Sequence, residues 1–266
     1  MHYEIHGRQD AGAPTLLLSS GLGGSGAYWA PNLPALSEHF RVISYDQRGT
    51  GRSPAELPDG YSIADMAEDV LALVDELGIE HCDFVGHALG GLVGLQVALQ
   101  RPELIRRLVP INAWATPNSH SARCFEARIE LLKCSGAAAY VAAQPIFLYP
   151  PVWLLENEAR VQRELEHALA HFPGEANTLR RIAALRAFDI LAQLPRIGCA
   201  TLVMASRDDV LVPWTQSRQL AAGLPNARLS LRDFGGHACN ITEHAQFDAE
   251  LLAFLLAPAP EISGDR

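Results

Sequence analysis

Basic residues are scarce in this chain. Against 30 aspartates and glutamates it has only 21 lysines and arginines, so its formal net charge is -9 over 266 residues. No run of lysine and arginine offsets this balance. Because a nucleic-acid backbone is bound through clustered positive charge, we expect no nucleic-acid partner. We expect a small-molecule substrate instead.

Cysteine patterns and long apolar runs are also missing. The five cysteines are scattered and odd in number, and no CxxC pair occurs, which argues against a disulfide framework or a zinc ribbon. Apolar runs such as LLAFLLA are too short to span a bilayer, and MHYEIHGRQD lacks the signal-peptide pattern. We therefore expect a soluble, reduced, cytoplasmic protein without membrane contact, metal or cofactor, either a monomer or a homodimer.

What the sequence does contain is a regular alternation of short apolar runs and helical patterns. The helical pattern SIADMAEDVLALVDELG begins with a cap at Ser62, a second follows residue 88, and HAQFDAELLAFLLA is the last. Strands alternating with helices predict an α/β fold with a mostly parallel central sheet and helices on both faces. The runs typical of buried parallel strands are 15–20, 41–46, 81–87, 105–113, 201–206 and 227–234.

The stretch 115–194 interrupts this alternation. It is helical in pattern, contains no strand run and is broken by QPIFLYPPVW. We expect an inserted helical cap at 115–194 between two parts of one core, 1–114 and 195–266. The terminal PAPEISGDR is predicted to be disordered.

A further absence lies in GHALGG, residues 86–91. The pattern Gly-x-Ser-x-Gly places a nucleophilic serine on a strained turn between a strand and a helix. Here Ala88 occupies the position of the serine, and its methyl group cannot form an acyl-enzyme. The interpretation is a catalytic elbow with a vacant nucleophile position. We expect the amide N–H of Leu89, at the start of the following helix, to help bind an anion.

A glycine-rich loop follows the run 15–20. Glycines allow a tight turn and let backbone amides point at a ligand. We expect Leu22 to supply the second amide of an oxyanion hole, with Ser20, Gly21 and Gly23 lining the substrate site. An ordinary glycine-rich turn has the same pattern, so this motif is weak alone.

Two later strand runs end in residues suited to proton transfer. Asp209 lies in SRDDVLVP after the run 201–206, and His237 lies in GGHACN after the run 227–234. A buried aspartate can orient a histidine and stabilise its protonated ring, and the chain order elbow, acid, histidine is typical of one hydrolase fold. Asp208 is the rival acid. We predict that His237 and Asp209 are catalytic.

With these motifs, the chain resembles the α/β-hydrolase superfamily over its whole length. Within that superfamily it is similar to the RutD family of bacterial pyrimidine utilisation, through SGLGGSGAYW, YDQRGTGRSP, GHALGG, CFEARIELL, AQPIFLYP and GGHACN. The resemblance implies that alanine at the elbow is native and that the enzyme hydrolyses a C–N bond late in uracil breakdown. It implies carbamate as the substrate, or 3-aminoacrylate, which would give malonate semialdehyde and ammonia.

Other functions stay open from the residues alone. The scaffold could bind a small molecule without catalysis, or run lyase or cofactor-free oxygenase chemistry with the His–Asp pair. Another nucleophile is conceivable at Ser20, Cys239 or Ser53, but we expect these to be packing or loop residues.

The predicted cap carries weaker candidates for substrate binding. Arg123 and Arg128 could steer a small anion, although a solvated helix face fits each of them as well. Trp114 could line an apolar lid or belong to the core. His167 and His171 have i, i+4 spacing suited to a metal, but no third ligand lies nearby, so a surface pair is the better interpretation.

Overall fold

The computed structural model describes residues 1–258, so most of the predicted disordered PAPEISGDR lies outside the described residues. Its centre is a seven-stranded sheet with the order β1-β3-β2-β4-β5-β6-β7, in which only the β1–β3 pair is antiparallel. The strands are β1 (Tyr3–Gly7), β2 (Thr15–Ser19), β3 (Arg41–Tyr45), β4 (Cys82–His87), β5 (Ile105–Ile111), β6 (Ala200–Ser206) and β7 (Ala227–Arg232). All six predicted strands are confirmed, and β1 is an addition.

Helices cover both faces of this sheet, as predicted. Along β2, Leu17 packs into the apolar cluster of α2 and α3, whereas Leu16 and Leu18 pack into a second cluster with Phe247 of α10. This alternation is what a strand buried on both faces requires. The core helices are η1 (Gly26–Trp29), α1 (Leu33–Ser37), α2 (Ile63–Glu76), α3 (Leu89–Gln100), α8 (Trp214–Gly223), α9 (Cys239–Thr242) and α10 (His244–Leu255).

The start of α2 shows how local sequence sets these boundaries. Ser62 Oγ accepts from the backbone N–H of Asp65, and the Asp65 carboxylate accepts from the Ser62 N–H. This capping box satisfies two amides that the first helical turn leaves free. The cap predicted at Ser62 is confirmed.

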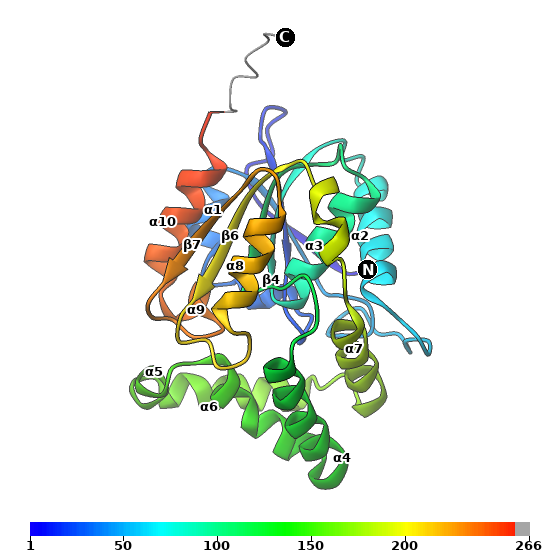
Figure 1. Cartoon of the computed structure of the whole chain (residues 1–266), viewed down its shortest axis with the longest axis vertical. Helices are drawn as coiled ribbons and strands as arrows, with labels where there is room; N and C mark the ends of the chain where they lie inside the picture. Colours follow the sequence, from blue (N-terminus) through cyan, green and yellow to red (C-terminus); the bar gives the residue numbers. More distant parts are fainter. Residues whose placement is uncertain (259–266) are drawn as a thin grey trace.

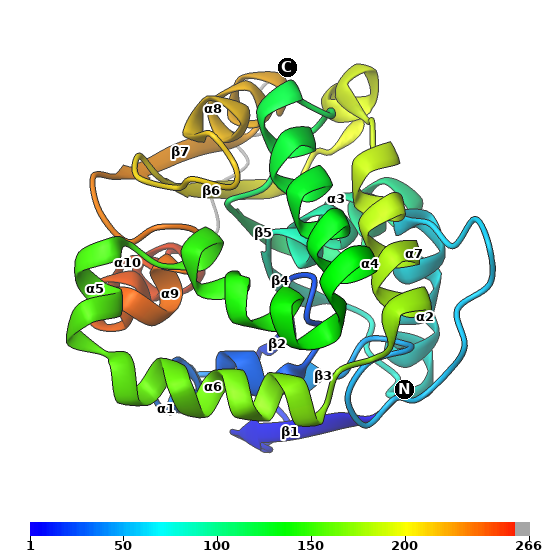
Figure 2. The ribbon, with the colours of Figure 1, turned by 90° about the horizontal axis from the view of Figure 1, so that it is seen from below.

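Four helices and a 3-10 turn lie between β5 and β6: α4 (Ser119–Leu148), α5 (Pro151–Glu156), α6 (Glu158–Ala170), α7 (Glu175–Ala187) and η2 (Leu191–Arg196). Figure 1 shows α4 to α7 grouped at the end of the sheet toward which the arrowheads of β6 and β7 point. Figure 2 views the molecule from that end, with these helices in front of the strands. Division of the chain into a core domain and a cap domain stays a prediction.

By length and composition alone, α4 could cross a membrane, which the short apolar runs did not indicate. Gly136, with φ 80° and ψ -178°, breaks the helical geometry and divides α4 into two segments. The structure therefore contains no straight 30-residue helix at this place.

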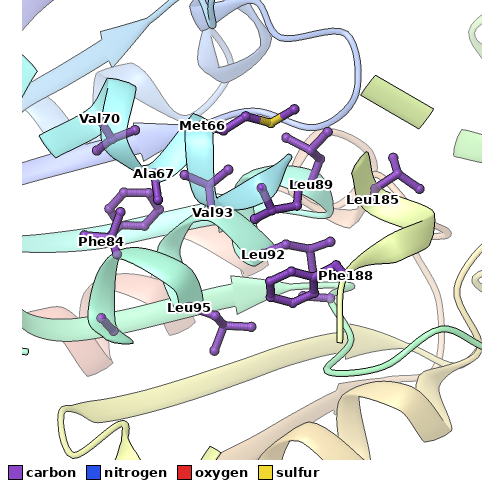
Figure 3. Close-up of a cluster of buried hydrophobic side chains, with 14 of the residues drawn as sticks. Met66, Ala67, Val70, Phe84, Leu89, Leu92, Val93, Leu95, Leu185 and Phe188 are labelled. Atoms are coloured by element: carbon purple, nitrogen blue, oxygen red, sulfur yellow. The ribbon is translucent and has the colours of Figure 1, made fainter. Parts of the chain in front are cut away.

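The end of α7 is fixed against the core. Phe188, just after α7, lies beside Leu92 of α3, and both belong with Leu185 to one apolar cluster (Figure 3). Removing such side chains from water is the main source of stability in a fold of this size. The contact sets the position of α7 relative to the elbow.

Candidate active site

The elbow has its expected shape without its nucleophile. Ala88 joins β4 to α3 with φ 48° and ψ -112°, a backbone conformation that costs a non-glycine residue free energy. Gly90 has to be glycine, because an added Cβ would overlap the Ser19 carbonyl of β2. The turn therefore presents position 88 as a nucleophile would be presented, but with a methyl group.

Two backbone amides, one in the loop that packs against His87 and one directly after Ala88, have no recorded protein partner among the described residues. Among the described residues, no hydrogen bond is recorded for the N–H of Leu22 or for the N–H of Leu89. Leu89 begins α3, where the first amides of a helix have no intrahelical acceptor. The Gly24 N–H donates to the Gly21 carbonyl over 3.0 Å, which closes a tight turn around Leu22 and Gly23. Both amides are available to an anion.

The predicted acid and histidine meet. His237 Nδ1 lies 2.7 Å from Asp209 Oδ2, and the exposed fractions of the two side chains are 3% and 0%. Asp209 Oδ1 accepts from the backbone N–H groups of Leu211 and Val212 over 2.8 and 2.9 Å. Since the carboxylate engages Nδ1, the Nε2 atom of His237 is the one that can exchange a proton with a ligand.

The rival acid has a different task. Asp208 accepts from the backbone N–H groups of Gly235 and Gly236 over 3.2 and 2.9 Å, and so it holds the loop that carries His237. The geometry thus pairs the histidine with Asp209 and leaves Asp208 to shape the backbone.

His87 forms a hydrogen bond with the backbone of His237, and the sequence analysis did not identify it as a site residue. The His237 carbonyl accepts from His87 Nε2 over 2.7 Å and from Asn112 Nδ2 over 2.6 Å. Burial and the neighbouring His237 lower the pKa of His87 to about 3, so its ring is neutral near pH 7. Its place inside GHALGG was the available signal.

Comparison with known proteins agrees with this geometry. A family model described as alpha/beta hydrolase fold matches residues 14–132. The chain is 57% identical over 263 residues to "Putative carbamate hydrolase RutD" of Stutzerimonas stutzeri (strain A1501), which covers 99% of both chains. It is 58% identical over 256 residues to the protein of that name in Agrobacterium fabrum, covering 96% of this chain and 98% of that one. The chain belongs to the RutD family. The predicted resemblance is confirmed.

Solved structures place the RutD-family chain among α/β-hydrolases. A hydrolase from Pseudomonas aeruginosa PA01 is 34% identical with a TM-score of 0.85, covering 96% of this chain and 94% of that one. The enol-lactonase from Burkholderia xenovorans LB400 is 29% identical with a TM-score of 0.87, covering 96% of each chain. The predicted α/β-hydrolase fold is confirmed, and the chain is a hydrolase.

The structure places the three weaker candidates for substrate binding in different environments. Arg123 is exposed and donates to the Ser119 carbonyl within its own helix, so nothing brings it to the elbow. Arg128 is buried among aromatic side chains of α4, and its Nη2 donates to the Tyr140 hydroxyl over 3.1 Å. Trp114 is buried in the main apolar cluster. Of these three, Arg128 alone is a buried polar group on one of the helices between β5 and β6.

The alternative nucleophiles lack activation. Burial raises the pKa of Cys239 to about 11, so its thiol stays protonated near pH 7. Ser53 Oγ accepts from the backbone N–H of His2 over 2.7 Å, and Ser20 Oγ is buried without a hydrogen-bond partner among the described residues. Within residues 1–258, no side-chain base forms a hydrogen bond with either hydroxyl.

His167 of α6 and His171, its C-cap residue, are both exposed, and their tilted rings have centroids 4.1 Å apart. Within residues 1–258, no group of three metal-ligating side chains occurs.

The RutD-family chain has one further site residue that sequence reasoning missed. Arg181 of α7 is 0% exposed; its Nε donates to the Leu22 carbonyl over 3.1 Å, and its Nη2 donates to Gln47 Oε1. The signal was helical periodicity, because Arg181 falls on the same face of α7 as the buried Thr178 and Leu185.

Proposed function

We propose that this hydrolase breaks carbamate down to ammonia and carbon dioxide by acid–base catalysis without a serine nucleophile. One observation carries the proposal: the buried pair of His237 and Asp209 is intact, while the elbow beside it presents only Ala88. A scaffold that merely bound ligands would need no oriented histidine. The names of the RutD relatives point to the same substrate.

The chemistry needs a proton and an anion site. In carbamate, H2N–COO⁻, the nitrogen takes a proton from Nε2 of protonated His237. The C–N bond then breaks, its electron pair leaves with nitrogen as ammonia, and an oxygen lone pair completes the second C=O bond of carbon dioxide. Asp209 stabilises the protonated ring before transfer. The free amides of Leu22 and Leu89 bind the carboxylate, in the turn formed by Gly21 and Gly23.

The magnitudes favour such a substrate over an ester. Positioned general acid catalysis contributes about 10²- to 10⁴-fold, which suits a reaction with a low intrinsic barrier. Losing the nucleophile of a serine triad costs on the order of 10⁶-fold in rate, which would leave an ester almost untouched. Water can attack the imine tautomer of 3-aminoacrylate without an acyl-enzyme, so that compound is the alternative substrate.

The test is ammonia release from freshly dissolved carbamate, followed by stopped flow at mildly alkaline pH, where the spontaneous reaction is slow. We expect the protein to accelerate release by about 10²-fold or more. The His237→Ala variant should lose this acceleration, and His171→Ala, a control at the exposed C-cap of α6, should keep it. No acceleration over buffer would overturn the carbamate proposal and make 3-aminoacrylate the next substrate to assay.

A further inference from the structure

The buried guanidinium of Arg181 has no counter-ion. Among the described residues, no carboxylate forms an ion pair with it, and its two hydrogen-bond partners, the Leu22 carbonyl and Gln47 Oε1, carry no charge. Burial lowers the pKa of Arg181 to about 10, so the group remains a cation near pH 7. A buried charge without a partner is costly, and proteins retain one where a ligand supplies the opposite charge or where function requires it.

The hydrogen bonds of Arg181 leave part of the guanidinium unused. A guanidinium carries five N–H donors in a rigid fork. The Leu22 carbonyl takes one from Nε and Gln47 takes one from Nη2, while Nη1 is buried without any partner in the described chain. The unused donors therefore lie on Nη1 and Nη2, at the end of the side chain. Carboxylates match this fork closely.

The position of Arg181 ties it to the anion site. Its Nε contacts the carbonyl of Leu22, the residue whose N–H is free to bind an anion. We propose that Arg181 binds the carboxylate of the substrate together with the amides of Leu22 and Leu89, and that it makes the site selective for small carboxylate anions. A carboxylate has about four lone-pair positions, enough for both sets of donors. The proposal rests on the proposed function for the identity of the anion.

Arg128 is a second buried arginine near this region. Its Nη2 donates to the Tyr140 hydroxyl. No acidic side chain pairs with Arg128 in the described residues, where its polar partners are Tyr140 and Gln144. Two buried arginines without counter-ions thus lie on α4 and α7, which are in contact with each other. This arrangement favours an anion and disfavours a neutral ligand of the same shape.

The test uses two probes of one shape and different charge. Acetate has the shape of carbamate but does not react, and acetamide is its neutral counterpart. Dissociation constants for both are measured by NMR titration of the full chain, of Arg181→Met, of Arg181→Lys, and of Arg186→Met. Arg186 lies on the same helix and is half-buried, with its guanidinium beside Glu126, so it controls for the loss of a helix charge.

The protein should bind acetate roughly 10- to 100-fold more tightly than acetamide, the range of a charge-assisted hydrogen bond. Arg181→Met should reduce this preference by weakening acetate alone, leaving the smaller part that the amides of Leu22 and Leu89 supply, and Arg186→Met should keep it in full. Equal binding of the two probes by the unsubstituted chain, or a preference that is undiminished in Arg181→Met, would overturn the proposal. Should Arg181→Met fail to fold, Arg181→Lys decides: it should weaken acetate several-fold and leave acetamide unchanged.

Because acetate does not react, this outcome is independent of turnover. Charge-selective binding by a chain that does not accelerate carbamate breakdown would support Arg181 and overturn the proposed reaction. Acceleration of carbamate breakdown that is unchanged in Arg181→Met, together with equal binding of the probes, would support the reaction and overturn the role of Arg181.

Discussion

Lowering the pH from 8 to 5 should destabilise the fold through His87. The folded state holds the pKa of this buried ring at about 3, against 6.5 for an unperturbed histidine. Between those two values the unfolded chain binds a proton that the folded chain excludes, so stability falls as the pH falls through this window. At pH 5 the unfolded histidine is about 97% protonated, and the resulting cost is about 2 kcal/mol relative to pH 8.

The free energy of unfolding in urea, measured at pH 8 and pH 5 for His87→Gln and for the unsubstituted chain, gives this cost. The other histidines contribute equally to both proteins and cancel in the difference. His87→Gln should therefore lose about 2 kcal/mol less stability on acidification. His171→Gln, which replaces an exposed histidine, should behave like the unsubstituted chain. If His87→Gln shows the same pH dependence as the unsubstituted chain, the folded state does accept a proton on His87, and the reasoning fails.

Two further predictions concern the site. Asp209→Asn should abolish most of the acceleration of carbamate breakdown, because His237 loses the carboxylate that orients it. Asp208→Asn should reduce the acceleration less than about 10-fold, since Asp208 binds only backbone amides. Equal losses in the two variants, measured by stopped flow, would count against the assignment of Asp209. Ala88→Ser should hydrolyse p-nitrophenyl acetate at least about 10²-fold faster than the unsubstituted chain, since the elbow and His–Asp pair are in place. The absorbance of released p-nitrophenol measures this gain in rate, which should vanish in the double variant Ala88→Ser/His237→Ala. Absence of the gain in Ala88→Ser would mean that His237 cannot reach position 88.

The strands were predictable because burial on both faces leaves a continuous apolar run. TLLLS in β2 and ATLVMAS in β6 have that form. The edge strand β1, YEIHG, is half-buried and mixes polar with apolar residues, so it left no such run. The break at Gly136 was equally hidden, because a single glycine in a long helical pattern does not reveal the sign of its φ angle.

Side-chain direction explains what the sequence could not decide in the site. Asp208 and Asp209 both follow β6, and only the backbone path shows which one turns toward His237. Arg180 and Arg181 pose the same problem on a helix, where consecutive residues point about 100° apart. Arg180 pairs with Asp59 near the surface over 2.8 Å, whereas Arg181 turns inward to Leu22. Two adjacent arginines thus have opposite environments, which their identity alone does not distinguish.

The backbone at Ala88 shows what the elbow retains. A non-glycine residue in a sparsely populated backbone conformation costs on the order of 1–3 kcal/mol, and this cost serves no nucleophile here. What the turn does secure is the direction of the Leu89 N–H and the close approach of Gly90 to the Ser19 carbonyl of β2. Both place the start of α3 beside Leu22, and Arg181 contacts the carbonyl of Leu22. The strain is therefore explained if the elbow serves to bind an anion, with His237 as the only group there that needs to exchange a proton.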